Sequence, residues 1–208
     1  MVGASARVRH TRGMTYPHKK APVDFPIIDA IAERWSPLAF DPKPVEEEKI
    51  RTMFEAARWA PSAYNEQPWR FVWARKGDKH RETLESLLVQ GNSWAKNAGV
   101  LILSFSKKTF GHNGNPNRHH LHDLGAASAY LVEQATALGL VTHQMSGYDA
   151  ERANEALGVP ADFEPGSMIA VGEYAGQDAL DEGSKKREES PRVRKTLDEI
   201  AFNDGWKA

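Results

Sequence analysis

The sequence predicts a single domain that mixes α-helices and β-strands. Two segments, 45–59 and 118–138, place apolar residues at helical spacing along one face, as amphipathic helices do. The run 100–105 is apolar without alternation, which is typical of a strand covered on both faces, and 168–172 is a further core strand. A chain of 208 residues is long enough to bury one sizeable core around these elements.

The first part of the chain is expected to lie outside this core. Residues 1–22 are rich in arginine, lysine and histidine and have no apolar block, so they lack the centre of a secretory signal. We expect a flexible basic arm at 1–22 and one domain over 23–208, whose last part, 176–208, is a C-terminal arm.

The remaining elements follow in chain order. Ile27, Ile28 and Ile31 stand at helical spacing, and Pro37 ends their segment. Further helices are expected at 45–59, 80–89, 118–138 and 149–157. Strands are expected at 71–74, 100–105, 140–145 and 168–172.

Particular residues mark the ends of these elements. Gly139 is expected to end the long helix in a left-handed cap, and Asp149 to cap the helix that follows. Residues 176–190 are rich in charge and poor in apolar groups, so we expect a loop or linker there.

The composition excludes several classes of function. Lys and Arg number 27 against 28 Asp and Glu, a formal net charge of −1, so no overall basic field indicates a nucleic-acid partner. The chain has no cysteine, which excludes disulfides, thiolate metal sites and iron–sulfur clusters and fits a cytoplasmic location. No apolar run approaches the length needed to cross a bilayer, so we expect no membrane partner.

The chain is organised around a polar loop between two prolines, Pro61 and Pro68. Each proline fixes its own φ and biases the residue before it, Ala60 or Gln67, toward an extended conformation. The loop therefore displays Ser62, Asn65 and Gln67, whose uncharged donors and acceptors suit the polar edge of a flat heterocycle. A solvated connector is the alternative interpretation of the same residues.

Arginines flank the core on both sides. Arg34 lies beside the break at Pro37 and is free to turn inward. Arg192, Arg194 and Lys195 precede a further helical segment and could clasp a phosphate, although a surface basic cluster has the same pattern. Neither the dinucleotide glycine pattern nor the P-loop pattern is present, and HExxH and GxSxG are absent.

Three separated segments together resemble the nitroreductase family of FMN-dependent oxidoreductases. These are 33–40 with the Pro-Val pair at 44–45, the Pro-Ser-x-x-Asn-x-Gln-Pro-Trp motif at 61–69, and the Arg-Val-Arg run at 192–194. The resemblance covers the chain from about residue 25 to the C-terminus. It implies an α+β fold, a three-layer α-β-α sandwich with a mostly antiparallel central sheet, in an intertwined homodimer with FMN at the interface.

The resemblance also implies a set of cofactor-binding residues. Arg34 and Ser36 would hold the phosphate and ribityl end of FMN, with Trp35 contributing its backbone. Arg192 and Arg194 would complete the phosphate clamp.

The flavin ring would be held by two further groups. Pro61 and Ser62 would come from the partner subunit and face the dimethylbenzene side, with Asn65 close by and Gln67 in the same loop. The strand end whose backbone faces the ring near flavin N5 would be formed by Gln144, Met145, Ser146 and Gly147, and Asn92 would reach the pyrimidine edge.

Two positions depart from the family pattern. The first motif often has a basic residue where this chain has Leu38, so Leu38 belongs to the expected site without the cationic contact to the flavin O2 region. Ser146 stands where some members have a glutamate placed for nicotinamide and flavin contacts. The choice between NADH and NADPH therefore does not follow from the sequence.

The implied activity passes a hydride from NADH or NADPH through flavin N5 to a small nitroaromatic, quinone-like or other conjugated acceptor. The flavin supplies the chemistry, so no side chain is assigned a catalytic role. An enzyme of the same fold that dehalogenates its substrate reductively or fragments the flavin is the alternative.

A histidine cluster indicates a different class of protein. His119 shares a helix face with His122 and Asp123, a spacing able to chelate a divalent metal. No metal-site motif surrounds His119, His120 and His122, so we expect a surface helix start and no metal site. Contact with a substrate, and a metal-binding or interaction protein, are the other interpretations.

Overall fold

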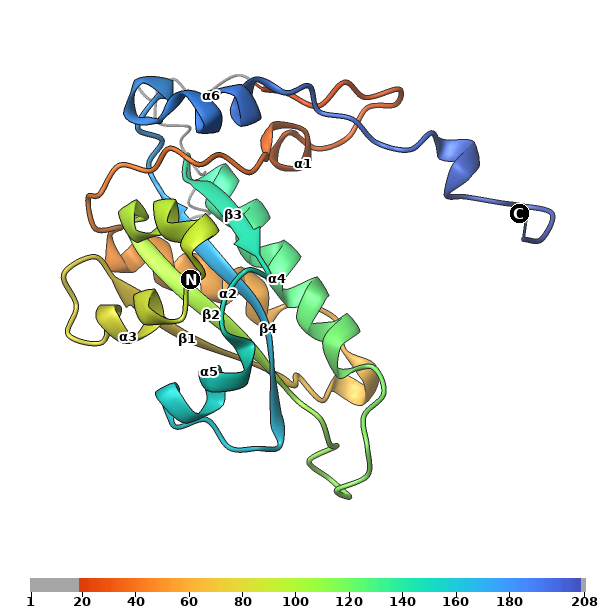
Figure 1. Ribbon diagram of the computed structural model, residues 1–208. Coiled ribbons are helices and arrows are strands. Elements are labelled where there is room, and N and C mark those ends of the chain that lie inside the picture. The colour runs from red at the N-terminus through yellow and green to blue at the C-terminus, as the bar shows by residue number, and fades with distance from the viewer. Residues whose placement is uncertain (1–18, 207–208) are drawn as a thin grey trace, which may run out of the picture.

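A four-stranded antiparallel sheet forms the centre of the computed structural model, which describes residues 19–206 (Figure 1). The strands are β1 (Trp69–Arg75), β2 (Val100–Lys107), β3 (Val141–Met145) and β4 (Phe163–Gly172). Their order is β1-β2-β4-β3, and every neighbouring pair is antiparallel. The predicted antiparallel sheet is thus confirmed, with β3 at one edge.

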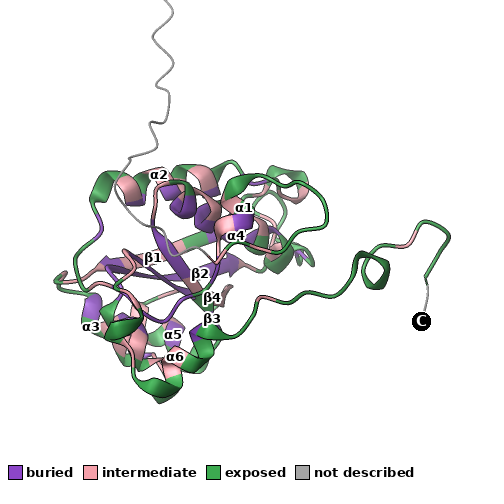
Figure 2. Ribbon diagram, turned by 90° about the horizontal axis from the view of Figure 1, so that it is seen from above, coloured by how far each residue is buried: buried purple, intermediate pink, exposed green. Residues whose placement is uncertain are grey.

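Helices cover both faces of the sheet and give the three layers that were predicted. One layer holds α1 (Asp29–Glu33), α2 (Glu47–Arg58) and α4 (His120–Ala137). The other holds α3 (Arg81–Ser86), α5 (Ala150–Leu157) and α6 (Glu182–Glu189). Figure 2 shows these layers on either side of the buried strands. Short 3₁₀ turns span Ala63–Asn65, Gln90–Asn97, Gln177–Ala179 and Leu197–Glu199.

Strand β2 joins the two halves of the core because its side chains alternate between them. Val100 and Ile102 pack with apolar residues of α2 and α4. Leu101, Leu103 and Phe105 pack with residues of α3 and α5. All five are fully buried, and each contributes about 1.5–3 kcal/mol relative to an exposed side chain. The prediction of a strand covered on both faces is confirmed.

Two predicted helix ends are also confirmed. Gly139 follows α4 with a φ of 77°, a left-handed conformation that costs glycine little. Asp149 caps α5, since its Oδ1 accepts a hydrogen bond from the backbone N–H of Arg152 at 3.1 Å.

Two predictions about secondary structure were wrong. Residues 176–190 contain helix α6, which begins where Asp181 Oδ1 accepts a hydrogen bond from the N–H of Ser184 at 2.9 Å. The helix expected at 80–89 ends at Ser86. It ends early because the Val89 N–H bonds to the carbonyl of Gly147 at 3.4 Å, and a 3₁₀ turn starts at the next residue.

The C-terminal segment leaves the body of the molecule after α6. Figures 1 and 2 both show residues 192–206 as an extended arm that projects away from the sheet. Its apolar side chains are exposed, with Val193 at 73% and Trp206 at 88%. The predicted N-terminal arm lies outside the described residues as far as residue 18. In residues 19–206, no helix is both long enough and apolar enough to span a bilayer.

Candidate functional site

The first motif forms a turn directly after α1. The helix ends at Glu33, and Arg34 takes a non-helical conformation with ψ of 124°. Trp35 is buried against the ring of Tyr174, with centroids 5.8 Å apart, while Ser36 is exposed. The Arg34 guanidinium donates a hydrogen bond to Ser36 Oγ at 3.3 Å. The two side chains predicted to hold a phosphate are therefore together on the surface.

A buried carboxylate supports this turn from inside the protein. Glu188 of α6 is 3% exposed, and its Oε1 accepts hydrogen bonds from the N–H groups of Leu38 at 2.5 Å and Ala39 at 3.0 Å. Its Oε2 accepts the hydroxyl hydrogen of Tyr174 at 2.7 Å. Burial raises the pKa of that tyrosine, and the bond to Glu188 raises it further. Hydrogen bonds to a charged group contribute about 1.5–3 kcal/mol each. Lys19 Nζ also donates to the Glu188 carbonyl.

His143 fixes the other side of the same turn. Its Nδ1 donates to the carbonyl of Pro37 at 2.9 Å, and its ring packs on Trp94 with centroids 4.5 Å apart. Burial lowers the pKa of His143, and the guanidiniums of Arg187 and Arg34 lower it further. The hydrogen bond to the Pro37 carbonyl acts in the opposite direction. A neutral imidazole therefore lies beside the two arginines.

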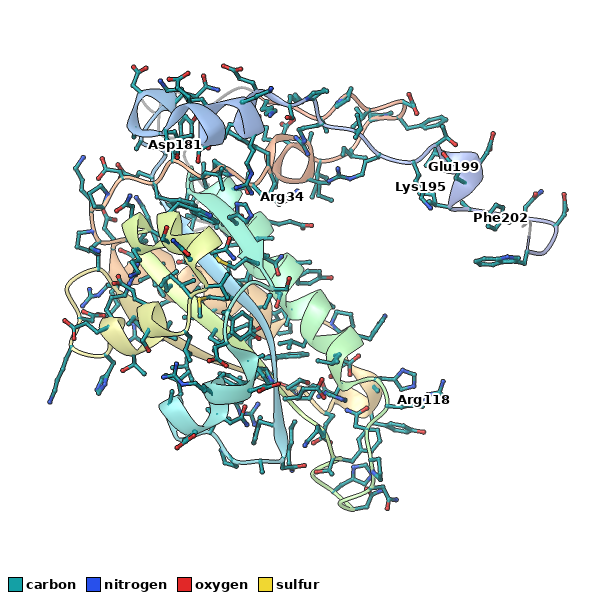
Figure 3. All side chains as sticks on the ribbon, viewed as in Figure 1. Arg34, Arg118, Asp181, Lys195, Glu199 and Phe202 are labelled. Carbon is teal, nitrogen blue, oxygen red and sulfur yellow. The ribbon has the colours of Figure 1, made fainter. Side chains whose placement is uncertain are left out.

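The two C-terminal arginines lie in different surroundings. Arg192 Nη1 donates to the carbonyls of Lys19 at 2.7 Å and Ala32 at 2.8 Å, which places it next to the end of α1. Arg194 Nη1 donates to the carbonyl of Val193 at 2.7 Å, on the exposed arm. Figure 3 labels Lys195 on that arm, well away from Arg34. The structure thus brings Arg192, but not Arg194, to the Arg34 turn within one chain.

The loop between Pro61 and Pro68 has a strained backbone. Tyr64, Asn65 and Gln67 have φ values of 53°, 55° and 51°. Residues other than glycine adopt this left-handed region at a cost of about 1–2 kcal/mol each. The expectation that Gln67 is extended was therefore wrong.

Hydrogen bonds on both sides of the loop offset this strain. Ser62 Oγ accepts from the Gln67 N–H at 3.0 Å, and the Gln67 carbonyl accepts from Arg70 Nη1 at 3.1 Å. Asp123 of α4 is 3% exposed, and its Oδ2 accepts from the Ala63 N–H at 3.0 Å. These bonds hold the exposed Pro61, Asn65 and Gln67 in one arrangement.

The residues expected near the flavin ring meet where β3 ends. Gln144 is exposed, and its Oε1 accepts the hydroxyl hydrogen of Ser167 at 3.0 Å, whereas Met145 is buried. Asn92 Nδ2 donates to the carbonyl of Gly147 at 2.9 Å. A Cβ on Gly147 would lie 2.4 Å from that Nδ2, so only glycine allows this close approach. Ser146, which stands between Met145 and Gly147 in the sequence, is exposed.

The two motif groups lie at opposite ends of α4. Asp123, which holds the Pro61–Pro68 loop, is in the first turn of this helix. Near its last turn, Gln134 and Ala137 line one cavity with Ile28 and Ala30 from the segment of α1. Figure 3 shows Arg34 at that end and Arg118 at the other. At about 1.5 Å per residue, α4 separates the motifs by roughly 20 Å.

The histidine cluster does not assemble a metal site in residues 19–206, where no three potential ligands lie close enough together. His122 Nδ1 lies 3.2 Å from Asp123 Oδ1, and His120 Nε2 lies 3.7 Å from a carboxylate oxygen of Glu164. These are pairwise contacts at the start of α4.

Sequence reasoning missed the residues that support the first motif. Glu188 and Arg187 stand in a run of charged residues, where nothing distinguishes a buried carboxylate from a solvated one. His143 stands in the predicted strand 140–145, next to Gln144, which was assigned to the site. The one signal in the sequence that indicated His143 was its position directly before Gln144.

The fold and these loops define a class: a three-layer α+β protein with arginine and serine side chains gathered at one end of a long helix and a polar loop, held by hydrogen bonds, at the other. The model of the nitroreductase family matches residues 31–93 and 87–173. The chain belongs to the nitroreductase family.

Individual relatives agree with this assignment. An uncharacterised 15.4 kDa protein from Mycolicibacterium smegmatis is 35% identical over 145 residues, 66% of this chain and 97% of that protein. A solved structure described as an oxidoreductase containing FMN is 37% identical, with a TM-score of 0.85 over 90% of this chain and 96% of the other. A Rhodopseudomonas palustris relative provisionally named NADH dehydrogenase/NAD(P)H nitroreductase is 28% identical over 53% of this chain and 66% of its own length.

Proposed function

We propose that the chain is an FMN-dependent oxidoreductase that takes a hydride from NADH or NADPH and delivers it to a small nitroaromatic, quinone-like or other conjugated acceptor. The observation that carries the proposal is the Arg34–Ser36 contact in a turn supported from behind by Glu188. The FMN-containing structure that is 37% identical supports the cofactor, and the provisional name of the R. palustris relative supports the reductant.

The side chains at this turn fit the phosphate of FMN. Arg34 provides a guanidinium and Ser36 a hydroxyl, and Arg192 is anchored at Ala32, two residues before Arg34. A dianionic phosphate needs several such donors, each contributing about 1.5–3 kcal/mol. The nearest buried carboxylate, Glu188, accepts hydrogen bonds with both oxygens from the protein itself. Arg34, Ser36 and Arg192 would therefore hold the phosphate.

Bound FMN would supply the hydride chemistry at its ring nitrogen N5. The residues of the chain hold and orient the ring. Gln144 is fixed by Ser167 on the exposed side of β3, and Asn92 fixes the turn at Gly147. We assign none of these side chains a proton-transfer role, so the proposal includes no catalytic side chain.

We further propose that a second copy of the chain completes each site. The Pro61–Pro68 loop lies roughly 20 Å along α4 from the Arg34 turn, so the two motifs do not lie side by side within one chain. An antiparallel second α4 would place the loop of one copy beside the Arg34 turn of the other. Exposed apolar side chains on this side, Trp59 at 71% and Tyr130 at 42%, support such a contact.

The extended C-terminal arm supports the same arrangement. Residues 193–206 expose Val193, Leu197, Ile200 and Trp206, and an arm of this composition is stable when it lies on another chain. In a homodimer the arm could also carry Arg194 to a phosphate of either copy. We place the enzyme in the cytoplasm, where NADH and NADPH are available, because a chain without cysteine needs no oxidising compartment to form disulfides.

Flavin content and two arginine variants test this function. The purified protein should be yellow, should release FMN on denaturation, and should be reduced anaerobically by NADH or NADPH. Arg34→Ala and Arg194→Ala should each bind FMN about 10- to 100-fold more weakly, because each loses a charge-assisted contact. Arg51→Ala removes an arginine whose partner within residues 19–206 is Glu47, on the surface of α2, and this variant should bind FMN as the unchanged protein does.

Two results would contradict the proposal. A colourless protein that takes up no added FMN would remove the cofactor assignment. Full FMN retention in both the Arg34 and the Arg194 variants would remove the phosphate clamp while leaving the cofactor in place.

A further inference from the structure

Helix α6 has no apolar side chain with which to dock. Its sequence from Glu182 to Glu189 is Glu-Gly-Ser-Lys-Lys-Arg-Glu-Glu, and the buried residue that it contains is Glu188. An eight-residue helix is not stable by itself in water, so contacts with the rest of the protein must hold it. Glu188 makes the buried contact of this helix, because its neighbours Arg187 and Glu189 are exposed and Ser184 and Lys185 are half-buried.

The partners of Glu188 belong to the turn that would bind the phosphate. Its Oε1 accepts from the N–H groups of Leu38 and Ala39, two and three residues after Ser36. Its Oε2 accepts from Tyr174, whose ring packs edge-on against Trp35 within the same turn. One carboxylate therefore fixes the backbone and the buried tryptophan of the turn that displays Arg34 and Ser36.

We infer that Glu188 is a positioning residue for the cofactor and that docking of α6 is coupled to FMN binding. The inference rests on the proposed function, because the ligand at Arg34 and Ser36 is the FMN phosphate. Glu188 holds the amides of Leu38 and Ala39, so the turn keeps the conformation that pairs Arg34 with Ser36. Coupling is reciprocal: a phosphate that orders this turn also stabilises the docked position of α6.

The structure predicts that this coupling is positive, so that docking of α6 strengthens FMN binding and FMN binding stabilises docked α6. Without the Glu188 carboxylate, two buried N–H groups and the Tyr174 hydroxyl lose their acceptor. FMN then has to order a mobile turn on binding, which weakens its affinity. In the other direction, α6 should open more often in the FMN-free protein than in the loaded one.

Two variants at position 188 and one neighbour test the positioning role. Glu188→Ala should weaken FMN binding about 10-fold or more, as measured by quenching of FMN fluorescence. Glu188→Gln keeps an oxygen that can accept from both amides, so it should recover most of that affinity. Glu189→Ala changes the exposed residue next along α6 and should bind as the unchanged protein does.

Limited trypsin digestion of the full chain provides a second readout. Lys186 and Arg187 are exposed cleavage sites within α6. FMN should slow cleavage at these sites several-fold in the unchanged protein, and the Glu188→Ala variant should lose this protection even when saturated with FMN. Equal FMN affinity of Glu188→Ala and the unchanged protein, or equal cleavage with and without FMN, would overturn the inference. An unchanged protein that binds no FMN would overturn the proposed function itself.

Discussion

At the scale of single residues, the first motif depends on side chains that no motif contains. Arg34 and Ser36 were predicted from the sequence to belong to the site, and Arg34 Nη1 lies 3.3 Å from Ser36 Oγ. Their placement relies on Glu188, 150 residues after Leu38, and on His143, which bonds the Pro37 carbonyl. A buried carboxylate in a charged run has no local signature, because its burial is decided by amides that are distant in the chain.

His143 makes the stability of this motif sensitive to pH. Burial holds the pKa of His143 below its ordinary value of 6.5, so between these two pKa values the unfolded chain binds more protons than the folded one. Neutral His143 therefore contributes to the stability of the folded protein at neutral pH. This contribution is lost as the pH falls below 6.5, the ordinary pKa of histidine, toward the lower pKa of His143 in the folded protein.

The His143→Asn variant tests this dependence, because an asparagine Nδ2 can still donate to the Pro37 carbonyl. Urea unfolding at about pH 7.5 and about pH 5.5 should show a smaller loss of unfolding free energy in the variant than in the unchanged protein. An equal loss in both proteins would mean that another group causes the acid sensitivity.

At the scale of elements, prediction succeeded where apolar periodicity decides the structure. The strands and the long helix α4 were found because each buries a patterned apolar face. It failed for α6, which has no such face, and for the conformation of Gln67. Hydrogen bonds from Gln67 to Ser62 and Arg70 hold its left-handed φ. Pro68 favours an extended conformation at Gln67, and this preference is weaker than the two hydrogen bonds.

Asp123 joins the strained loop to α4, so its removal should release that loop. Asp123→Ala leaves the Ala63 N–H without its acceptor and should lower the free energy of unfolding by about 1–3 kcal/mol. The exposed neighbour His122 is the control, and His122→Ala should change stability by no more than about 0.5 kcal/mol. Equal urea midpoints for Asp123→Ala and His122→Ala would refute the role of Asp123.

At the scale of the whole molecule, the two motifs assigned to the proposed site lie apart within one chain. The Arg34 turn and the Pro61–Pro68 loop are at opposite ends of α4, and the C-terminal arm leaves its apolar side chains exposed. The sequence could indicate both halves, since each is a local motif. It could not indicate their separation, because that distance depends on how the loop packs against the first turn of α4.

The most direct test of this account is a heterodimer of two defective chains, one with Arg34→Ala and the other with Ser62→Trp, purified through different affinity tags. Each variant should bind little FMN as a homodimer. If each site combines the Arg34 turn of one copy with the loop of the other, the heterodimer retains one intact site and should bind about half the FMN of the unchanged dimer. A heterodimer that binds no FMN would show that both motifs serve a site within one chain and would contradict the account.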